Sequence, residues 1–380
     1  MTPTELLIGQ ITAVERSLVR ASDSLDTQEK AVSSALRKRV RGRFGNDLLG
    51  LRNRCQSLRD RIRGGASAEV GWGQLDKLQA DASDLLRECL AFLEGGLVRA
   101  AGLDGGVCAL ADKMFEALND RTDLAWQRFT LVAAGEFYST LSGIVRLRFT
   151  DTDIWSLPVA VHEFGHFVSS TPRFTEFAEL TDREKGNDPR YESHLRELFS
   201  DLFATYALGP SLVLACALLR FSPSGAESNT HPSNAQRVWW MLETLANMDK
   251  TEGDPAFGPI AVKIRESWTA ALKAVGQPEA LPDGEISRLR PWLLDLYDLV
   301  NSSIPMVRYR NILRAQEMYQ GLRNGQTPVV RADDEIPDVL NAAWLYRLNM
   351  ADLNAFELDR IGGQAFQMCE NIANQAQCPI

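Results

Sequence analysis

Apolar residues recur at alternating spacings of three and four along the first hundred residues. One stripe contains Leu7, Ile11, Val14, Leu18, Ala21 and Leu25. A second contains Leu48, Leu51, Cys55, Leu58 and Ile62, and a third contains Leu75, Leu78, Ala82, Leu85, Cys89 and Phe92. This spacing puts the apolar side chains on one face of each helix. Residues 1–104 are therefore predicted to form a helical bundle or a coiled-coil hairpin, with helix breaks at Gly64-Gly65 and Gly95-Gly96.

The pattern changes after residue 104, where Asp-Gly-Gly indicates a boundary. A helix is predicted over Cys108–Leu118, and residues 143–149 alternate apolar and basic side chains, which is typical of a strand. The edge of that strand could pair with an extended peptide, or the strand could belong to the core.

Two helices are expected in the middle of the chain. The first starts at Ser156, a suitable N-cap, and stops at residues 169–172, Ser-Ser-Thr-Pro. The second starts after Asp188-Pro189 and stops at Gly209-Pro210. The charged residues 173–191 between them are predicted to form a surface loop. A further helical region is expected over residues 276–380, where Leu289, Trp292, Leu293, Leu296 and Leu299 make an amphipathic stretch.

Composition limits the classes of partner and the compartment. The net charge of −9 argues against nucleic acid as the main partner, because phosphate binding requires a basic surface. Residues 202–219 carry no charge, but Gly209-Pro210 divides them, so two buried helices are expected and no membrane span. The first 25 residues do not resemble a signal peptide, and the six cysteines are scattered. Reduced thiols and a cytoplasmic location are therefore expected.

Basic residues concentrate in one segment of the N-terminal region. Ten of the residues from Arg37 to Arg63 are Lys or Arg and only two are acidic, which leaves the rest of the chain near −17. Such a segment is a solvated helix face, a binding site for an acidic or activating protein partner, or an intramolecular clamp against the acidic remainder of the chain.

The segment His162-Glu163-Phe164-Gly165-His166 carries the strongest chemical signal. Two imidazoles four residues apart on a helix lie on one face and can bind the same metal ion. Glu163, beside the first of them, can take a proton from a water molecule at an open coordination position. The sequence therefore predicts one catalytic Zn²⁺ ion per chain, bound by His162 and His166, with Glu163 as the general base.

A catalytic zinc usually has three protein ligands, so one is still missing. The second helix offers Glu197, which we expect to be the third ligand because the surrounding residues are apolar and a buried, unpaired glutamate is costly. His194 is the alternative ligand, and otherwise a residue of the cleft rim. Asp201, one turn after Glu197, is expected to hold the outer nitrogen of His162 or His166.

Together, His162-Glu163-x-x-His166 and Glu197-x-x-x-Asp201 resemble the gluzincin metallopeptidases, the thermolysin-like class. The segment from Thr230 to Arg237 resembles the His-Pro segment and following Arg of CaaX-protease-type gluzincins. That resemblance implies that His231 donates to the oxyanion and that Arg237 pairs with Asp201. Either His231 or Arg237 would then stabilise the oxyanion. It covers roughly residues 140–245, and the flanking helical regions lie outside it.

The resulting expectation is a mainly α protein with a zincin-like metallopeptidase core and a small edge sheet over residues 105–275, flanked by helical regions 1–104 and 276–380. It would be a zinc-dependent endopeptidase acting on a protein or peptide substrate, and a partner could gate it. Two alternatives remain: a helical binding or scaffold protein with a structural or vestigial zinc site, and a zinc hydrolase acting on a non-peptide amide or ester.

Overall fold

The computed structural model describes residues 3–28, 34–122, 124, 130–134, 137–139, 144–148, 153–252, 256–350 and 354–375. The described part is mainly α-helical, as predicted. The chain divides into two compact units. The first consists of residues 1–106, 131–134 and 139–144, and the second consists of residues 107–130, 135–138 and 145–380. Residues 276–380 therefore belong to the same unit as the two central helices.

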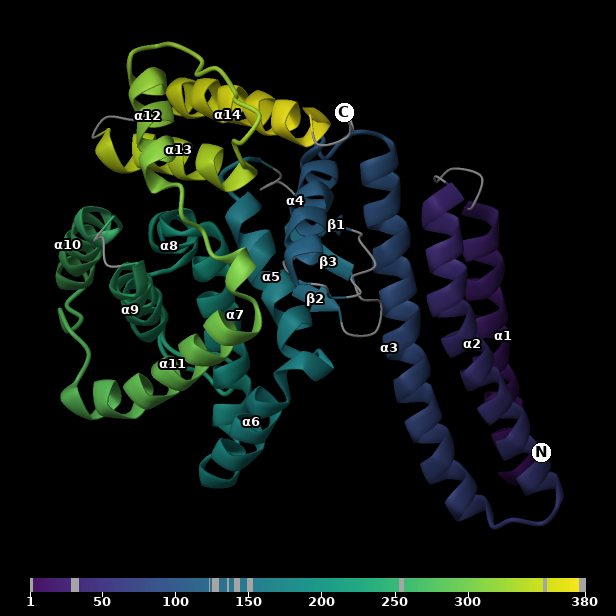
Figure 1. Cartoon of the computed structure of the whole chain (residues 1–380). Coiled ribbons are helices and arrows are strands. Elements are labelled where there is room, and N and C mark those ends of the chain that lie inside the picture. Colours follow the sequence, from purple (N-terminus) through teal and green to yellow (C-terminus); the bar gives the residue numbers. More distant parts are fainter. Residues whose placement is uncertain are drawn as a thin grey trace. The chain divides into compact units, whose positions relative to one another are not determined.

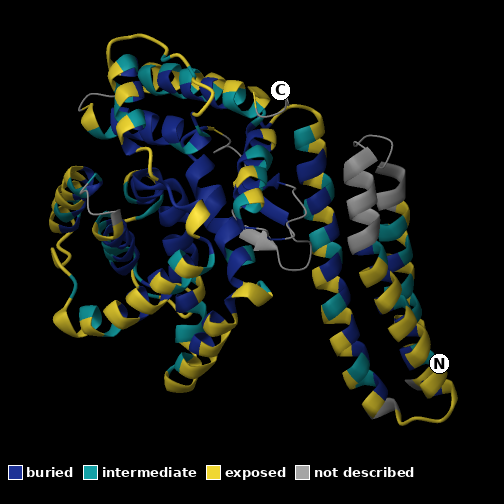
Figure 2. Cartoon of the chain, in the orientation of Figure 1, coloured by how far each residue is buried: buried dark blue, intermediate teal, exposed yellow. Residues whose placement is uncertain are grey.

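Three long helices build the first unit: α1 (Pro3–Gln28), α2 (Ser34–Arg63) and α3 (Ala68–Ala100). They pack side by side (Figure 1). The predicted stripes form their common core, and the buried positions recur along each helix in Figure 2. Those of α2 and α3 are buried throughout, as are Leu7, Ile11 and Leu18 of α1. The predicted break at Gly64-Gly65 is confirmed, because α2 ends at Arg63.

The predicted helix break at Gly95-Gly96 is wrong, because α3 continues to Ala100. A Cβ atom on Gly95 would lie 2.4 Å from the carbonyl oxygen of Val132. The glycine therefore permits close approach of strand β1 (Thr130–Ala133) to the helix and does not end it.

A three-stranded sheet has the strand order β1-β3-β2, with β2 at Phe137–Ser139 and β3 at Ile144–Arg148. The predicted strand is confirmed as β3. The suggestion that its free edge binds substrate is wrong, because β3 is the middle strand and both of its edges are paired.

The two central helices are α5 (Leu157–Ser169) and α7 (Arg190–Leu208), and they pack against each other. Both start and stop where the sequence predicted. Gly209 ends α7 with φ of 65°, a conformation that glycine adopts without strain. The uncharged segment after Asp201 forms the end of α7 and the buried helix α8 (Pro210–Ala215). Within the described residues, no helix combines the length and apolar character that a membrane span needs.

The charged segment predicted to be a surface loop is instead helical over α6 (Thr175–Asn187), after the short 3₁₀ helix η1 (Pro172–Phe174). Phe174, Phe177 and Leu180 are buried at intervals of three residues, and the Phe177 ring lies 4.7 Å from that of Phe199 on α7. The apolar spacing, which the charges obscured, determines the structure of this segment.

The rest of the second unit is helical. Its remaining elements are α4 (Val107–Thr122), the π-helical turn η2 (Cys216–Arg220), α9 (Asn234–Glu252), α10 (Gly258–Ala274), α11 (Asp283–Ser303), η3 (Pro305–Val307), α12 (Ile312–Arg323), α13 (Ile336–Asn349) and α14 (Ala355–Gln375). In the amphipathic stretch predicted around Trp292, every residue but Leu299 is buried.

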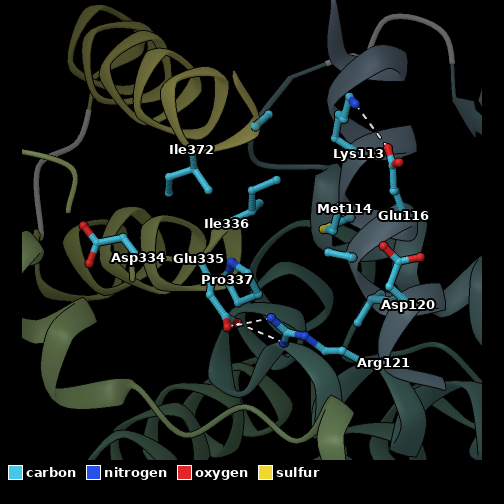
Figure 3. A pocket seen from close by; sticks show the side chains of 13 residues that line it. Lys113, Met114, Glu116, Asp120, Arg121, Asp334, Glu335, Ile336, Pro337 and Ile372 are labelled. Carbon is cyan, nitrogen blue, oxygen red and sulfur yellow. Dashed lines mark hydrogen bonds and ion pairs between the residues drawn. The ribbon is translucent and has the colours of Figure 1, made fainter. Parts of the chain in front are cut away.

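A pocket of about 310 Å³ lies among α4, α13 and α14 (Figure 3). Apolar side chains, among them Met114, Ile336 and Ile372, line it together with charged groups. The guanidinium of Arg121 donates two hydrogen bonds, of 2.6 and 3.0 Å, to the carboxylate of Glu335. This ion pair joins α4 to the start of α13.

Candidate metal centre

Helix α5 carries both predicted metal-binding histidines on one face. His162 and His166 are one helical turn apart, and their rings lie 4.9 Å apart at an interplanar angle of 88°. His162 is buried, whereas 21% of the His166 side chain is exposed. The helix therefore holds one imidazole in the interior and presents the other at the surface.

A glycine brings the second helix into range. A Cβ atom on Gly165 would lie 2.8 Å from Cα of Ser200 on α7, a distance that side chains essentially never reach. The backbones of α5 and α7 therefore approach closely at this point. Ser200 follows Glu197 by three residues, so the contact also places Glu197 beside the histidines.

The carboxylate of Glu197 lies between the two imidazoles. Oε2 is 3.4 Å from Nε2 of His162, and Oε1 is 3.4 Å from Nε2 of His166. One potential ligand atom from each of the three residues lies within 4.8 Å of the others. The side chain that the sequence selected as third ligand thus converges with the two histidines.

These separations are longer than direct hydrogen bonds and of the order that separates the ligands of a zinc ion. Ligands about 2.0–2.1 Å from a tetrahedral zinc lie about 3.3 Å from one another. An N–H···O hydrogen bond, by comparison, is usually about 2.9–3.0 Å long. The two 3.4 Å distances end on different oxygens of Glu197, and one potential ligand atom from each residue lies within 4.8 Å of the others. The cluster can therefore close around an ion, and its donor set of two imidazoles and a carboxylate is one that zinc accepts.

Asp201 and Arg237 lie behind the three candidate ligands. Oδ1 of Asp201 is 2.9 Å from Nδ1 of His162, the nitrogen that points away from Glu197. Arg237, on α9, donates to both carboxylate oxygens of Asp201 at 2.7 and 2.8 Å. Asp201 is fully buried, and such a carboxylate fixes the orientation and the tautomer of the histidine that it contacts.

The charges in this cluster stabilise one another. Burial alone would raise the pKa of Glu197, but His162, His166 and Arg237 hold it well below its usual range. Burial likewise opposes ionisation of Asp201, yet Arg237 and His162 lower its pKa. Burial disfavours a charge on His162, but Asp201 and Glu197 raise its pKa to about 10. Both carboxylates are therefore ionised at neutral pH, where Arg237 and the proton on His162 balance them; a metal ion bound by His162 would have to displace that proton.

Glu163, the predicted general base, is buried, with 8% of its surface exposed. Throughout the described residues no hydrogen bond or ion pair involves its carboxylate, and it is not among the three candidate ligands. A carboxylate that is not engaged by other described side chains can accept a proton.

The structure places His231 at the cluster as well, on the segment between η2 and α9. Its Nε2 is 3.6 Å from Oε1 of Glu197, and 54% of its side chain is exposed. Arg237 contacts Glu197 at 3.4 Å, but its guanidinium is bound to Asp201 and packs 4.7 Å from the ring of Phe221. The structure therefore pairs Arg237 with Asp201 and leaves the His231 ring exposed beside Glu197.

Both roles suggested for His194 are wrong. It is buried on α7, so it is not a rim residue, and it does not join the three candidate ligands. Its Nε2 lies 2.8 Å from the carbonyl oxygen of Ser228. Ser228 was not predicted from the sequence. The available signal was its position three residues before His231, a spacing at which serine side chains often bond to nearby backbone.

Comparison with known proteins adds no relative to this description. No protein-family model, curated protein or solved structure matches the chain.

Proposed function

We propose that the protein is a zinc-dependent endopeptidase that hydrolyses peptide bonds of a protein substrate. The observation that carries the proposal is the convergence of His162, His166 and Glu197, each of which offers one potential ligand atom within 4.8 Å of the others. It is supported by Glu163, whose carboxylate is free to act as a base, and by Asp201, which holds the outer nitrogen of His162.

His162, His166 and Glu197 would hold the zinc ion, which when bound would supply Lewis acidity to polarise a carbonyl group and lower the pKa of water. The residues of the chain perform the proton transfers. Glu163 takes a proton from the attacking water as the new C–O bond forms, and passes it to the leaving nitrogen as the C–N bond breaks. His231 donates a hydrogen bond to the oxyanion that develops on the carbonyl oxygen.

We also propose a cytoplasmic location, supported by five buried cysteines that form no disulfide among the described residues, namely Cys55, Cys89, Cys108, Cys216 and Cys369. The basic face of α2 is the proposed site for an acidic, activating protein partner. Arg54 and Arg61 of this helix line a groove with Lys77 of α3, and Arg54 pairs with Asp81 at 2.7 Å.

A helical scaffold with a structural zinc site is the main alternative. The long helices of the first unit favour it, since they provide an extended surface. A structural zinc site, however, usually has four protein ligands, whereas the described residues supply a group of three here. The group of three favours the enzyme.

The test compares wild type with Glu163→Gln, both loaded with zinc, in a cell lysate whose new protein N-termini are sequenced by mass spectrometry. Glu163→Gln retains all three ligands and loses only the base, so it is the matched control. We expect new N-termini with wild type and none with the variant. Identical N-termini in the two samples, with one zinc per chain in both, would contradict the peptidase proposal and favour the scaffold.

A further inference from the structure

We propose that His194 and Thr230 are positioning residues for His231. His194 fixes the backbone that carries His231, and Thr230 holds its ring in the tautomer with hydrogen on Nε2, the nitrogen nearest Glu197. The inference rests on the proposed function, because it assigns these residues to the same site, and it concerns contacts that can be measured without turnover.

The first step connects α7 to the segment before α9. His194 is three residues before Glu197 on α7, and only 2% of its surface is exposed. Its Nε2–H donates to the carbonyl oxygen of Ser228 over 2.8 Å. Because a carbonyl oxygen only accepts, this contact also fixes the hydrogen of His194 on Nε2. The helix that supplies the carboxylate ligand thus also holds Ser228.

The second step connects Ser228 to His231. The amide of Ser228 donates to the carbonyl oxygen of His231 at 2.9 Å, and the amide of His231 donates to Oγ of Ser228 at 3.0 Å. These two reciprocal bonds close a four-residue turn. The backbone position of His231 is therefore set through Ser228 by His194.

The third step fixes the ring. With 54% of its side chain exposed, the imidazole of His231 is not held by packing. Oγ1 of Thr230 lies 2.8 Å from Nδ1, and Nε2 lies 3.6 Å from Oε1 of Glu197. A hydroxyl that donates to Nδ1 leaves the hydrogen on Nε2, where it faces the carboxylate. The opposite tautomer would turn a lone pair toward a negatively charged oxygen, which is unfavourable.

The tautomer of His231 determines whether its ring can stabilise the oxyanion. An oxyanion is stabilised by a donor that is already oriented before the charge develops. Neutral imidazole is a donor at one nitrogen only, so the tautomer decides whether His231 can serve. Thr230 selects the tautomer, and His194 sets the distance.

The first experiment measures the tautomer. The chain has only four histidines, so the ¹⁵N signals of their ring nitrogens in the zinc-loaded protein can be assigned by single substitutions. We expect hydrogen on Nε2 of His231 in wild type and in Thr230→Ser, and a mixture of tautomers in Thr230→Val, which has nearly the same shape without the hydroxyl. Hydrogen on Nδ1 in wild type, or no change in Thr230→Val, would overturn the proposal.

The second experiment is a double-mutant cycle between His194 and His231. We expect His194→Leu to keep one zinc per chain and lower kcat about 10-fold or more, within the range for loss of an oxyanion donor. His194→Gln, whose amide can reach the Ser228 carbonyl, should recover most of the loss. His231→Ala should then cost less than about 3-fold in the His194→Leu background.

If the losses of kcat in His194→Leu and His231→Ala simply multiply in the double variant, His194 acts on stability alone. That result would overturn its positioning role. The two proposals can fail separately. A zinc-loaded wild type that hydrolyses nothing, but whose His231 tautomer responds to Thr230→Val, would refute the peptidase and retain the positioning. An active enzyme whose His231 tautomer does not respond to Thr230→Val would retain the peptidase and refute the positioning.

Discussion

Gly165 on α5 lies against the backbone of Ser200 on α7, so closely that an added Cβ atom would be 2.8 Å from Cα and 3.2 Å from the carbonyl oxygen of Ser200. This contact sets the distance between the helix that carries both histidines and the helix that carries Glu197. The second variable position of the His-Glu-x-x-His segment is therefore constrained by packing between helices.

Gly165→Ala should separate α5 from α7. Because the atoms in the way belong to backbone, they cannot rotate aside, and we expect a loss of about 1–3 kcal/mol in the free energy of unfolding. Glu197 should move away from His162 and His166, so the zinc dissociation constant should rise by about 10-fold or more. Urea denaturation and chelator competition measure the two effects.

Gly186→Ala is the matched control for that experiment. Gly186 is an exposed glycine of α6, and a Cβ there would contact nothing within 4 Å. This variant should be as stable as wild type or more so, by up to about 1 kcal/mol, because alanine favours the helix. Equal zinc affinity in Gly165→Ala and wild type would show that the helix contact does not position Glu197.

Zinc should stabilise the second unit. A ligand that binds only the folded state raises stability by about 2.7 kcal/mol at 100 times its dissociation constant, which corresponds to about 5 °C in the unfolding midpoint of a domain of this size. The shift should be retained in Glu163→Gln and lost in His166→Ala, which removes a ligand. Scanning calorimetry with and without zinc measures it, and a full shift in His166→Ala would refute the assigned ligand set.

Asp201→Asn should weaken zinc binding by about 10–100-fold, as expected when the partner of a ligating histidine is changed. It should also destabilise the fold, because buried Arg237 loses its charged partner. Asp334→Asn is the control, since Asp334 accepts a similar pair of hydrogen bonds, at 2.6 and 2.8 Å, from Arg314.

The control variant should lose stability and keep its zinc affinity. Chelator competition distinguishes the two variants. If both bind zinc as tightly as wild type, the contact between Asp201 and His162 does not tune the site.

Asp338→Asn should change how stability depends on pH. Burial raises the pKa of Asp338 from its usual value of 3.8 to about 6. Folding therefore takes up a proton between these values, and the contribution of Asp338 to stability declines as the pH rises from about 4 to 6. Its Oδ2 accepts from the amide of Glu335 at 2.8 Å, a bond that the asparagine oxygen can keep.

The variant should be more stable than wild type at pH 7.5 by about 1–3 kcal/mol, since one pKa unit corresponds to about 1.4 kcal/mol. The difference should shrink or reverse near pH 4. Urea denaturation at both values tests it, and a difference that does not depend on pH would show that Asp338 is not protonated on folding.

The periodic positions were predictable because helix geometry makes them a local property. Leu48, Cys55 and Ile62 are buried as their spacing requires. The pattern of charged residues predicted secondary structure less well than the apolar spacing did. Residues 175–187 read as a loop by their charges, but the burial of Phe177 and Leu180 makes them a helix. Gly95 was predicted to end the helix. A glycine is needed there because the carbonyl oxygen of Val132 lies close, and no local rule predicts such a long-range contact.

The sequence by itself determined which helices form and which side chains share a face, because both follow from a fixed number of residues per turn. It thereby paired His162 with His166 and placed Glu197 on the same helix as Asp201. Only the tertiary structure decided that these two pairs meet. That outcome depends on the close approach of Gly165 to Ser200, residues far apart in the chain, where long-range packing and not local spacing sets the distance.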